Sequence, residues 1–144
     1  MYHLVYTSHA SRHFKEEDLV SLLKECRAFN KEHDITGMLL HIQGKFIQVL
    51  EGSQQEVVSL FEQIAIDPRH NRVAVVVEGD SESRIFKNWS MGFKRLTDDQ
   101  AIHLSGFKDI DQFFAKKNIQ KKSNLLLIFL RLFYDKNMVE FAEL

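Results

Sequence analysis

The segment KFIQVLEG, from Lys45 to Gly52, has the alternating pattern of a β-strand with two different faces. One face carries Phe46, Gln48 and Leu50, and the other carries Ile47 and Val49. Because Phe46 and Leu50 are typical core residues, the amide between them needs an explanation. Burying an amide without hydrogen-bond partners costs roughly 1–3 kcal/mol on protein mutational scales. Gln48 therefore either faces water or is held by partners inside the protein.

Strands and helices are predicted on both sides of this segment. Upstream, a short turn at Gln43-Gly44 joins it to a strand and so predicts a β-hairpin. Downstream, Ser53 and Glu56 form a capping box that opens a helix, which Asp67-Pro68 ends. The remaining periodic segments predict a first strand, a first helix, the hairpin partner and two late strands: Tyr2–Ser8, Asp18–Asn30, Met38–Ile42, Arg72–Glu78 and Trp89–Leu96.

The resulting order, β-α-β-β-α-β-β, predicts a ferredoxin-like α/β sandwich over residues 1–96. This fold covers one face of its sheet with two helices. The continuous apolar run at Arg72–Glu78 predicts a strand buried on both faces. Since Val5, Ile47 and Val49 make the second sheet face apolar as well, we expect residues 97–144 to form a C-terminal helical cap over it.

Composition excludes several classes of protein. The 144 residues suffice for one domain, and the net charge of −1 gives no electrostatic footprint for nucleic acid. Cys26 is the only cysteine, which fits a cytoplasmic location, and the longest apolar run is too short to span a membrane. The scattered histidines lack zinc spacing, so no metal site is expected.

Several polar or polarisable side chains are predicted to surround one gap between the two helices and the sheet. They are Tyr6, Asn30, Gln48, Trp89 and Met91. A phenol, two amides, a thioether and an indole provide no strong base, thiolate or metal-ligand set. They do provide hydrogen-bond donors and acceptors for a flat heteroaromatic ring.

These residues stand in motifs that resemble the BLUF family, the blue-light sensors that use flavin. The resemblance covers residues 1 to about 96, with spacings of 24 from Tyr6 to Asn30, 18 from Asn30 to Gln48 and 41 from Gln48 to Trp89. The motifs, in order, are LVYTS (4–8), Asn30 followed by ITGMLL (35–40), GKFIQVLEG (44–52), DPRH (67–70), and RIF (84–86) with WSMGF (89–93).

The resemblance implies a role for each matching residue. Tyr6 is the electron and proton donor to light-excited flavin, and Gln48 bridges Tyr6 and the flavin ring and rearranges after light. Asn30 binds the carbonyl edge of the ring, and Trp89 and Met91 pass on the state of Gln48. Asp67, Arg69 and His70 are expected on the ribityl side, so the implied flavin-binding set is Tyr6, Asn30, Gln48, Asp67, Arg69, His70 and Met91.

The resemblance also implies a non-covalent flavin, with FAD preferred and FMN as the alternative. Phe29 stands where a polar residue is common in the family, and Gln63 where several relatives carry an arginine. The second difference bears on contacts to the flavin phosphate. Output is expected through a light-dependent protein partner that remains to be identified, with neither nucleic acid nor a membrane involved.

Two other functions remain open on the same fold. One is a small acyl phosphatase-like enzyme, although the predicted loop Thr7–Ser11 lacks the glycines and arginine that cradle a phosphate. The other is an interaction module that does not respond to light. A yellow purified protein separates the sensor, which is not an enzyme, from both. The segment Ser123–Asp135 is apolar nearly all round, which predicts a homo-oligomer or a partner site.

Overall fold

The computed structural model describes residues 1–42, 44–80, 82–87 and 90–96. Within these residues, five strands and two helices follow the predicted order. They are β1 (Tyr2–Ala10), α1 (Glu16–Glu32), β2 (Thr36–Ile42), β3 (Lys45–Gly52), α2 (Gln54–Ala65), β4 (His70–Asp80) and β5 (Gly92–Leu96).

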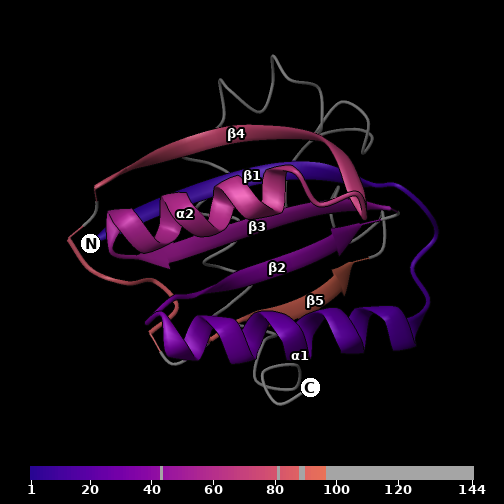
Figure 1. The fold of residues 1–144 in the computed structure, drawn as a ribbon, viewed down its shortest axis with the longest axis horizontal. Helices are drawn as coiled ribbons and strands as arrows, with labels where there is room; N and C mark the ends of the chain where they lie inside the picture. The colour runs from indigo at the N-terminus through magenta and orange to yellow at the C-terminus, as the bar shows by residue number, and fades with distance from the viewer. Residues whose placement is uncertain (43, 81, 88–89, 97–144) are drawn as a thin grey trace.

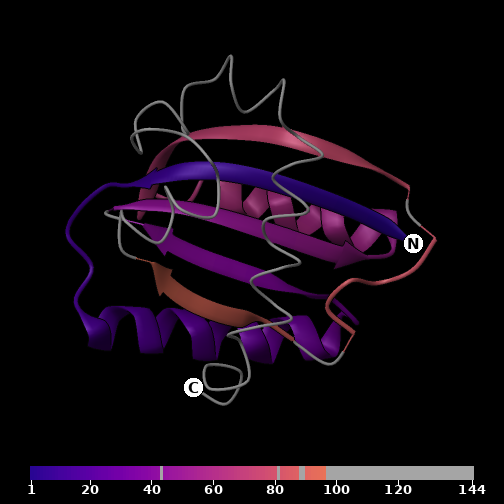
Figure 2. The same ribbon diagram turned by 180° about the vertical axis from the view of Figure 1, so that it is seen from behind.

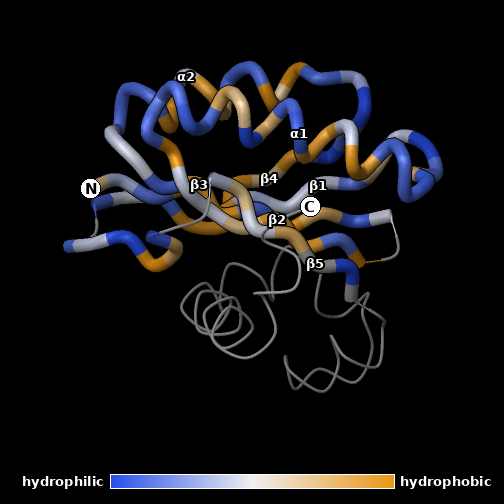
Figure 3. Tube along the Cα trace, turned by 90° about the horizontal axis from the view of Figure 1, so that it is seen from below, coloured by the Kyte–Doolittle hydropathy of each residue, from blue (hydrophilic) through white to orange (hydrophobic). Residues whose placement is uncertain are grey.

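The strands form one sheet in the order β4-β1-β3-β2-β5, and both helices lie on the same face of it (Figures 1 and 3). The central pair, β1 and β3, is antiparallel and sets Tyr6 directly opposite Gln48. β5 extends the sheet by pairing in parallel with β2. This arrangement confirms the predicted ferredoxin-like sandwich.

Local chemistry explains where several elements begin and turn. The Ser53 side chain accepts a hydrogen bond from the Glu56 N–H at 3.3 Å, as the predicted cap requires. The first turn of α1 carries Glu16, Glu17 and Asp18, whose charges favour the positive end of the helix dipole. Gly44 adopts a φ of 75° in the turn between β2 and β3, a conformation that glycine reaches without steric cost.

The main core lies between the helices and the sheet. Its buried members from the strands, the helices and the connecting segments are Tyr2, Leu4, Tyr6, Phe14, Leu19, Leu23, Ile35, Leu39, Phe46, Leu50, Val57, Met91 and Phe93. α2 packs on β1 and β3, in the middle of the sheet. Neither helix in the described part of the chain is long and apolar enough to cross a bilayer.

Figure 2 shows the opposite face of the sheet, which neither α1 nor α2 covers. On this face Val5, Ile47 and Val49 are each 0% exposed. The predicted helical cap, residues 97–144, lies outside the described residues, as does the boundary proposed for it.

Three predictions about the strands were wrong. β4 lies at one edge of the sheet, with β5 at the other, and none of the β4 residues is fully buried; Val75 is 37% exposed. An apolar run reports strand propensity and cannot by itself distinguish a central from an edge strand. β1 continues to Ala10, so most of the predicted loop Thr7–Ser11 is strand, and β5 begins at Gly92, after Met91.

Candidate functional site

A cavity of about 200 Å³ opens between α1 and α2 on the helical face of the sheet. Both helices, β1, β2, β3 and the segment between α2 and β4 contribute to its wall. The lining residues are Tyr6, Phe14, Leu22, Glu25, Cys26, Phe29, Asn30, Leu39, Phe46, Gln48, Leu60, Gln63, Ile64, Asp67, Arg69 and His70. Six of the seven predicted flavin-binding residues therefore line one cavity.

Gln48 lies inside this cavity wall and is held by two partners. Its side chain is 4% exposed. The Tyr6 hydroxyl donates a hydrogen bond to Gln48 Oε1, and Gln48 Nε2 donates to Met91 Sδ at 3.4 Å. The antiparallel register of β1 and β3 creates the first contact, because it places Tyr6 opposite Gln48. The amide is thus buried with partners, which explains a glutamine between Phe46 and Leu50.

Tyr6 is a protonated phenol in a dry environment. It is 4% exposed, and its ring lies 5.4 Å from the ring of Phe61 and 6.2 Å from that of His70, measured between centroids. Burial raises the pKa of Tyr6 well above its ordinary value because the interior disfavours a phenolate. At neutral pH the hydroxyl therefore keeps the proton that it donates to Gln48.

Asn30 ties α1 to the residues that lead into β5. It is 2% exposed, and its Nδ2 donates to the Ser90 carbonyl oxygen at 2.6 Å. Arg27, one turn earlier on α1, donates from Nε to the Met91 carbonyl oxygen at 2.8 Å. These two bonds hold the backbone on either side of the Met91 side chain that contacts Gln48.

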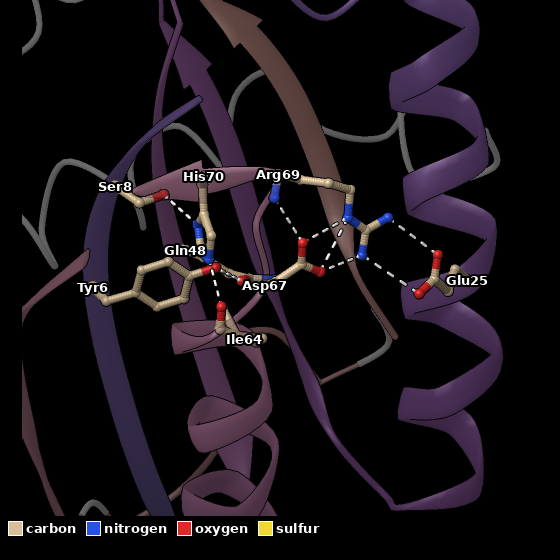
Figure 4. A network of polar contacts seen from close by, with 8 residues as sticks. All are labelled: Tyr6, Ser8, Glu25, Gln48, Ile64, Asp67, Arg69 and His70. Atoms are coloured by element: carbon tan, nitrogen blue, oxygen red, sulfur yellow. Dashed lines mark hydrogen bonds and ion pairs between the residues drawn. The ribbon is translucent and has the colours of Figure 1, made fainter. Parts of the chain in front are cut away.

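At the cavity mouth, Arg69 bridges both sides of the opening (Figure 4). Its guanidinium binds Asp67 with Nη2–Oδ2 and Nε–Oδ1 distances of 2.6 and 3.0 Å, and reaches Glu25 of α1 at 3.3 Å. The hydrogen bonds from Arg69 lower the pKa of Asp67 below its ordinary value. The mouth thus carries an ionised network that links the α2–β4 segment to α1.

His70 lies beside Tyr6 and is bound at both ring nitrogens. Nδ1 contacts Ser8 Oγ at 2.9 Å, and Nε2 contacts the Ile64 carbonyl oxygen (Figure 4). Because both nitrogens have protein partners, the imidazole has a fixed position next to the phenol.

Sequence reasoning missed part of this site. Glu25 and Arg27 lie outside the motifs, and the contact of the Ser90 carbonyl oxygen was not predicted although Ser90 stands in the motif WSMGF. The partners of these three residues lie 44 to 64 residues away along the chain. Cys26, to which sequence reasoning assigned no role in the site, is half-buried and lines the cavity. Burial raises the pKa of its thiol to about 11, so the sulfur carries its proton at neutral pH.

Trp89 and Met91 were both predicted on the last strand. Trp89 lies outside the described residues, whereas Met91 is described and directly precedes β5. Among the described residues, no group of three or more His, Cys, Asp or Glu side chains could hold a metal ion.

Residues 1–92 match the family model for BLUF domains, described as sensors of blue-light using FAD. The match extends over more than half of the 144 residues. The chain belongs to the BLUF family. It is accordingly a blue-light sensor that binds flavin, FAD or FMN, as BLUF domains do. These domains are photosensors and not enzymes in themselves.

Curated relatives with this domain are much longer proteins. The chain is 36% identical over 89 residues to the photoactivated adenylate cyclase subunit beta of Euglena gracilis, covering 61% of this chain and 10% of that protein. It is 41% identical over 81 residues to the subunit alpha-like protein FB of the same organism, covering 56% and 8%. The chain thus spans about a tenth of the length of these relatives.

Solved structures of BLUF proteins share the fold. The photo-activated state of BlsA superposes with a TM-score of 0.73 at 25% identity, covering 96% of this chain and 97% of that one. Klebsiella pneumoniae BlrP1, in a structure with FMN and cyclic diGMP, superposes with a TM-score of 0.61 at 32% identity, covering 71% and 28%.

The cavity has the chemistry that a flavin ring needs. Leu22, Phe29 and Leu60 provide apolar wall for a flat aromatic ring. Gln48 Nε2 carries two hydrogens, and its partner among the described residues is a thioether sulfur, which is a weak acceptor. A carbonyl or ring nitrogen of a flavin is a stronger acceptor for the same amide. The residues present therefore fit the cofactor of the family.

Proposed function

We propose that this BLUF domain is a light-driven hydrogen-bond switch in which Tyr6 is the redox-active residue and Gln48 is the moving part. The observation that carries the proposal is the buried chain from Tyr6 Oη through the Gln48 amide to Met91 Sδ. When bound, the flavin supplies a ring that absorbs blue light and becomes a strong oxidant on excitation.

Tyr6 gives up an electron and its hydroxyl proton, and the hydrogen bond to Gln48 Oε1 provides the path for the proton. The proton has a short route because the two side chains are already in contact. When the electron and proton return to Tyr6, the chain regains its starting composition. The lasting change is the arrangement of the Gln48 amide, by rotation or tautomerisation.

The contact of Gln48 with Met91 depends on the arrangement of the Gln48 amide. In the present arrangement Nε2 faces the sulfur at 3.4 Å. A rotated amide places its oxygen there instead, and an oxygen facing a thioether lacks a donor. Met91 lies next to β5, so a displacement of its backbone reaches the edge of the sheet. Buried hydrogen-bond chains of this kind support two discrete arrangements.

The flavin contacts follow from the same cavity. We expect Tyr6, Asn30 and Gln48 to contact the ring, with Met91 behind Gln48, and Asp67, Arg69 and His70 to lie toward the ribityl chain. Asn30 has an amide oxygen in addition to the nitrogen that binds Ser90, so it can bind the ring edge while it holds the β5 segment. FAD is the preferred flavin, with FMN as the alternative.

The output is passed to a light-dependent protein partner. The support is that the cyclase relatives and BlrP1 carry the BLUF fold as a small part of a longer protein. In this chain, residues 97–144 follow β5 directly and include the apolar stretch Leu125–Phe133. We place the output in this segment, as a cap on the sheet and a surface for a second chain, in a cytoplasmic homo-oligomer without enzymatic activity of its own.

Two variants test the switch. In the wild type, the rearranged Gln48 amide is expected to shift the flavin absorption slightly to the red under blue light, reversibly in the dark. Tyr6→Phe keeps the ring and removes only the hydroxyl, so this variant is expected to bind flavin and remain yellow but to show no red shift. Gln48→Leu is expected to bind flavin and to lack the shift because it has no amide to rearrange. A normal, reversible shift in either variant, measured by absorption spectroscopy, contradicts the mechanism.

The output proposal has a separate test. Light scattering coupled to size-exclusion chromatography and hydrogen exchange are measured in the dark and under blue light. We expect an oligomer whose residues 97–144 exchange differently in the two states. A strict monomer with identical exchange in this segment refutes it.

A further inference from the structure

The carboxylate of Glu51 is buried, and the motif that contains it, GKFIQVLEG (44–52), assigned it no role. Glu51 is on β3, three residues after Gln48, and its side chain points to the face opposite the helices. It is 1% exposed. A buried carboxylate needs donors around it, because an unpaired buried charge is strongly destabilising.

Those donors come mainly from the segment that leads to Met91. Glu51 Oε2 accepts the Ile85 N–H at 2.6 Å, and Oε1 accepts the Phe86 N–H at 2.9 Å. Oε1 also accepts a longer bond from Thr36 Oγ1 at 3.3 Å. Burial raises the pKa of Glu51, while the bonds from Ile85 and Phe86 oppose that effect by favouring the carboxylate. The side chain therefore anchors two successive backbone amides.

Arg84, which precedes Ile85 and Phe86, adds further hydrogen bonds between this segment and the sheet. Its Nη1 donates to Thr36 Oγ1 at 2.8 Å and to the Glu51 carbonyl oxygen at 3.1 Å. Its Nη2 donates to the Asp34 carbonyl oxygen at 2.7 Å. Arg84 thus joins the α1–β2 turn and the ends of β2 and β3 to the same segment. Phe86, which follows, is fully buried.

The other end of the segment is anchored at the photoactive site. The Ser90 carbonyl oxygen binds Asn30, the Met91 carbonyl oxygen binds Arg27, and the Met91 sulfur accepts from Gln48. β3 therefore contacts this part of the chain at two described places: Glu51 binds Ile85 and Phe86, and Gln48 contacts Met91. Only the second contact changes when the Gln48 amide rearranges.

We propose that Glu51 is a positioning residue for the photocycle: with Arg84, it anchors residues 84–86 so that Met91 is presented to Gln48 in one position. This proposal rests on the proposed function. After light, the contact between Gln48 and Met91 must form again. A fixed segment start limits the positions that Met91 samples, and so favours this step.

The principal variant is Glu51→Gln, which keeps the shape of the side chain but replaces one acceptor oxygen with an NH₂ group. One of the two backbone N–H groups then faces a donor. We expect flavin binding to persist. The return of the flavin absorption to its dark spectrum after illumination, called dark recovery here, is expected to slow at least threefold. Glu62→Gln, at an exposed position of α2, is the matched control and is expected to recover at the wild-type rate.

A double-mutant cycle separates positioning from general destabilisation. In a Met91→Ala background, Glu51→Gln is expected to have no further effect on recovery, because no sulfur remains to be positioned. An unchanged or faster recovery in the single variant overturns the proposal. So does an equal slowing in both backgrounds. If Glu51→Gln does not fold, Arg84→Lys provides a less disruptive variant, because it keeps the charge but loses the fork of donors. The same outcomes then apply to Arg84→Lys.

A measurement in the dark keeps this test independent of the light response. The ¹³C-methyl resonance of Met91, assigned with Met91→Leu, is expected to shift or broaden in Glu51→Gln and to stay in place in Glu62→Gln. If wild-type protein lacks a photocycle, the proposed function fails, while this readout still decides the role of Glu51. An unchanged Met91 signal overturns the role.

Discussion

Gly37 of β2 lies where the structure has no room for a side chain, so Gly37→Ala is a severe test of the packing around the switch. A Cβ built at this position lies 1.9 Å from the carbonyl oxygen of Val49 and 3.2 Å from the Met91 methyl group. The ordinary separation of a carbon and a carbonyl oxygen in neighbouring strands is about 3.3 Å. The first contact therefore cannot exist without movement of the backbone.

The cost can be worked from that movement. β2 must move away from β3 by roughly 1 Å or more, judged against the same contact distance. Overpacking a core costs about 1–3 kcal/mol, and each weakened backbone hydrogen bond adds about 0.5–1.5 kcal/mol. We therefore expect Gly37→Ala to lower the free energy of unfolding by about 3–5 kcal/mol. That is a large fraction of the stability of a typical domain, about 5–15 kcal/mol.

The assay is urea-induced unfolding followed by far-ultraviolet circular dichroism, with flavin content measured on the same samples. Gly52→Ala is the matched control in the neighbouring strand, where the nearest atom to a Cβ is the Asp34 carbonyl oxygen at 3.2 Å. It is expected to cost less than about 1 kcal/mol, within the range of tolerated changes. If Gly37→Ala is within 1 kcal/mol of the wild type, the close approach of β2 and β3 at this position is refuted.

Two further predictions concern the cofactor and pH. The flavin is held without a covalent bond, because the Cys26 thiol is protonated at neutral pH; acid precipitation should release the chromophore, and a yellow pellet contradicts this. Burial lowers the pKa of His41 to about 4, helped by Arg95 and His13, and its Nδ1 has no partner among the described residues. His41 therefore binds fewer protons in the native state than in the unfolded state between pH 4 and pH 6.5. The stability that the protein keeps while His41 is neutral in both states is complete above pH 6.5 and is lost as the pH falls toward 4. The shift corresponds to at most about 3 kcal/mol, which solvent screening reduces to roughly 1–2 kcal/mol. Urea unfolding at pH 7 and pH 4.5 should show a smaller loss for His41→Leu than for the wild type; an equal loss rules out His41 as the source.

The order of elements and the face of Gln48 could be predicted from the sequence because both depend on local periodicity. Alternation over Lys45–Gly52 places Gln48 beside Phe46 and Leu50 in any strand, and the Ser53 cap is a contact between residues three apart. The motif spacings from Tyr6 to Gln48 likewise depend only on chain positions.

The tertiary structure alone decided which strand lies at the edge and which distant groups meet. β4 has the apolar run of a central strand, yet strand order places it at the edge, because pairing is set by the whole topology. Arg69 meets Glu25 across 44 residues, Asn30 meets Ser90 across 60, and Glu51 meets Phe86 across 35. Side chains of these types are ordinary on a protein surface. Their roles arise only because the fold buries them or places them beside a partner, where an unsatisfied polar group is costly and a satisfied one fixes the backbone.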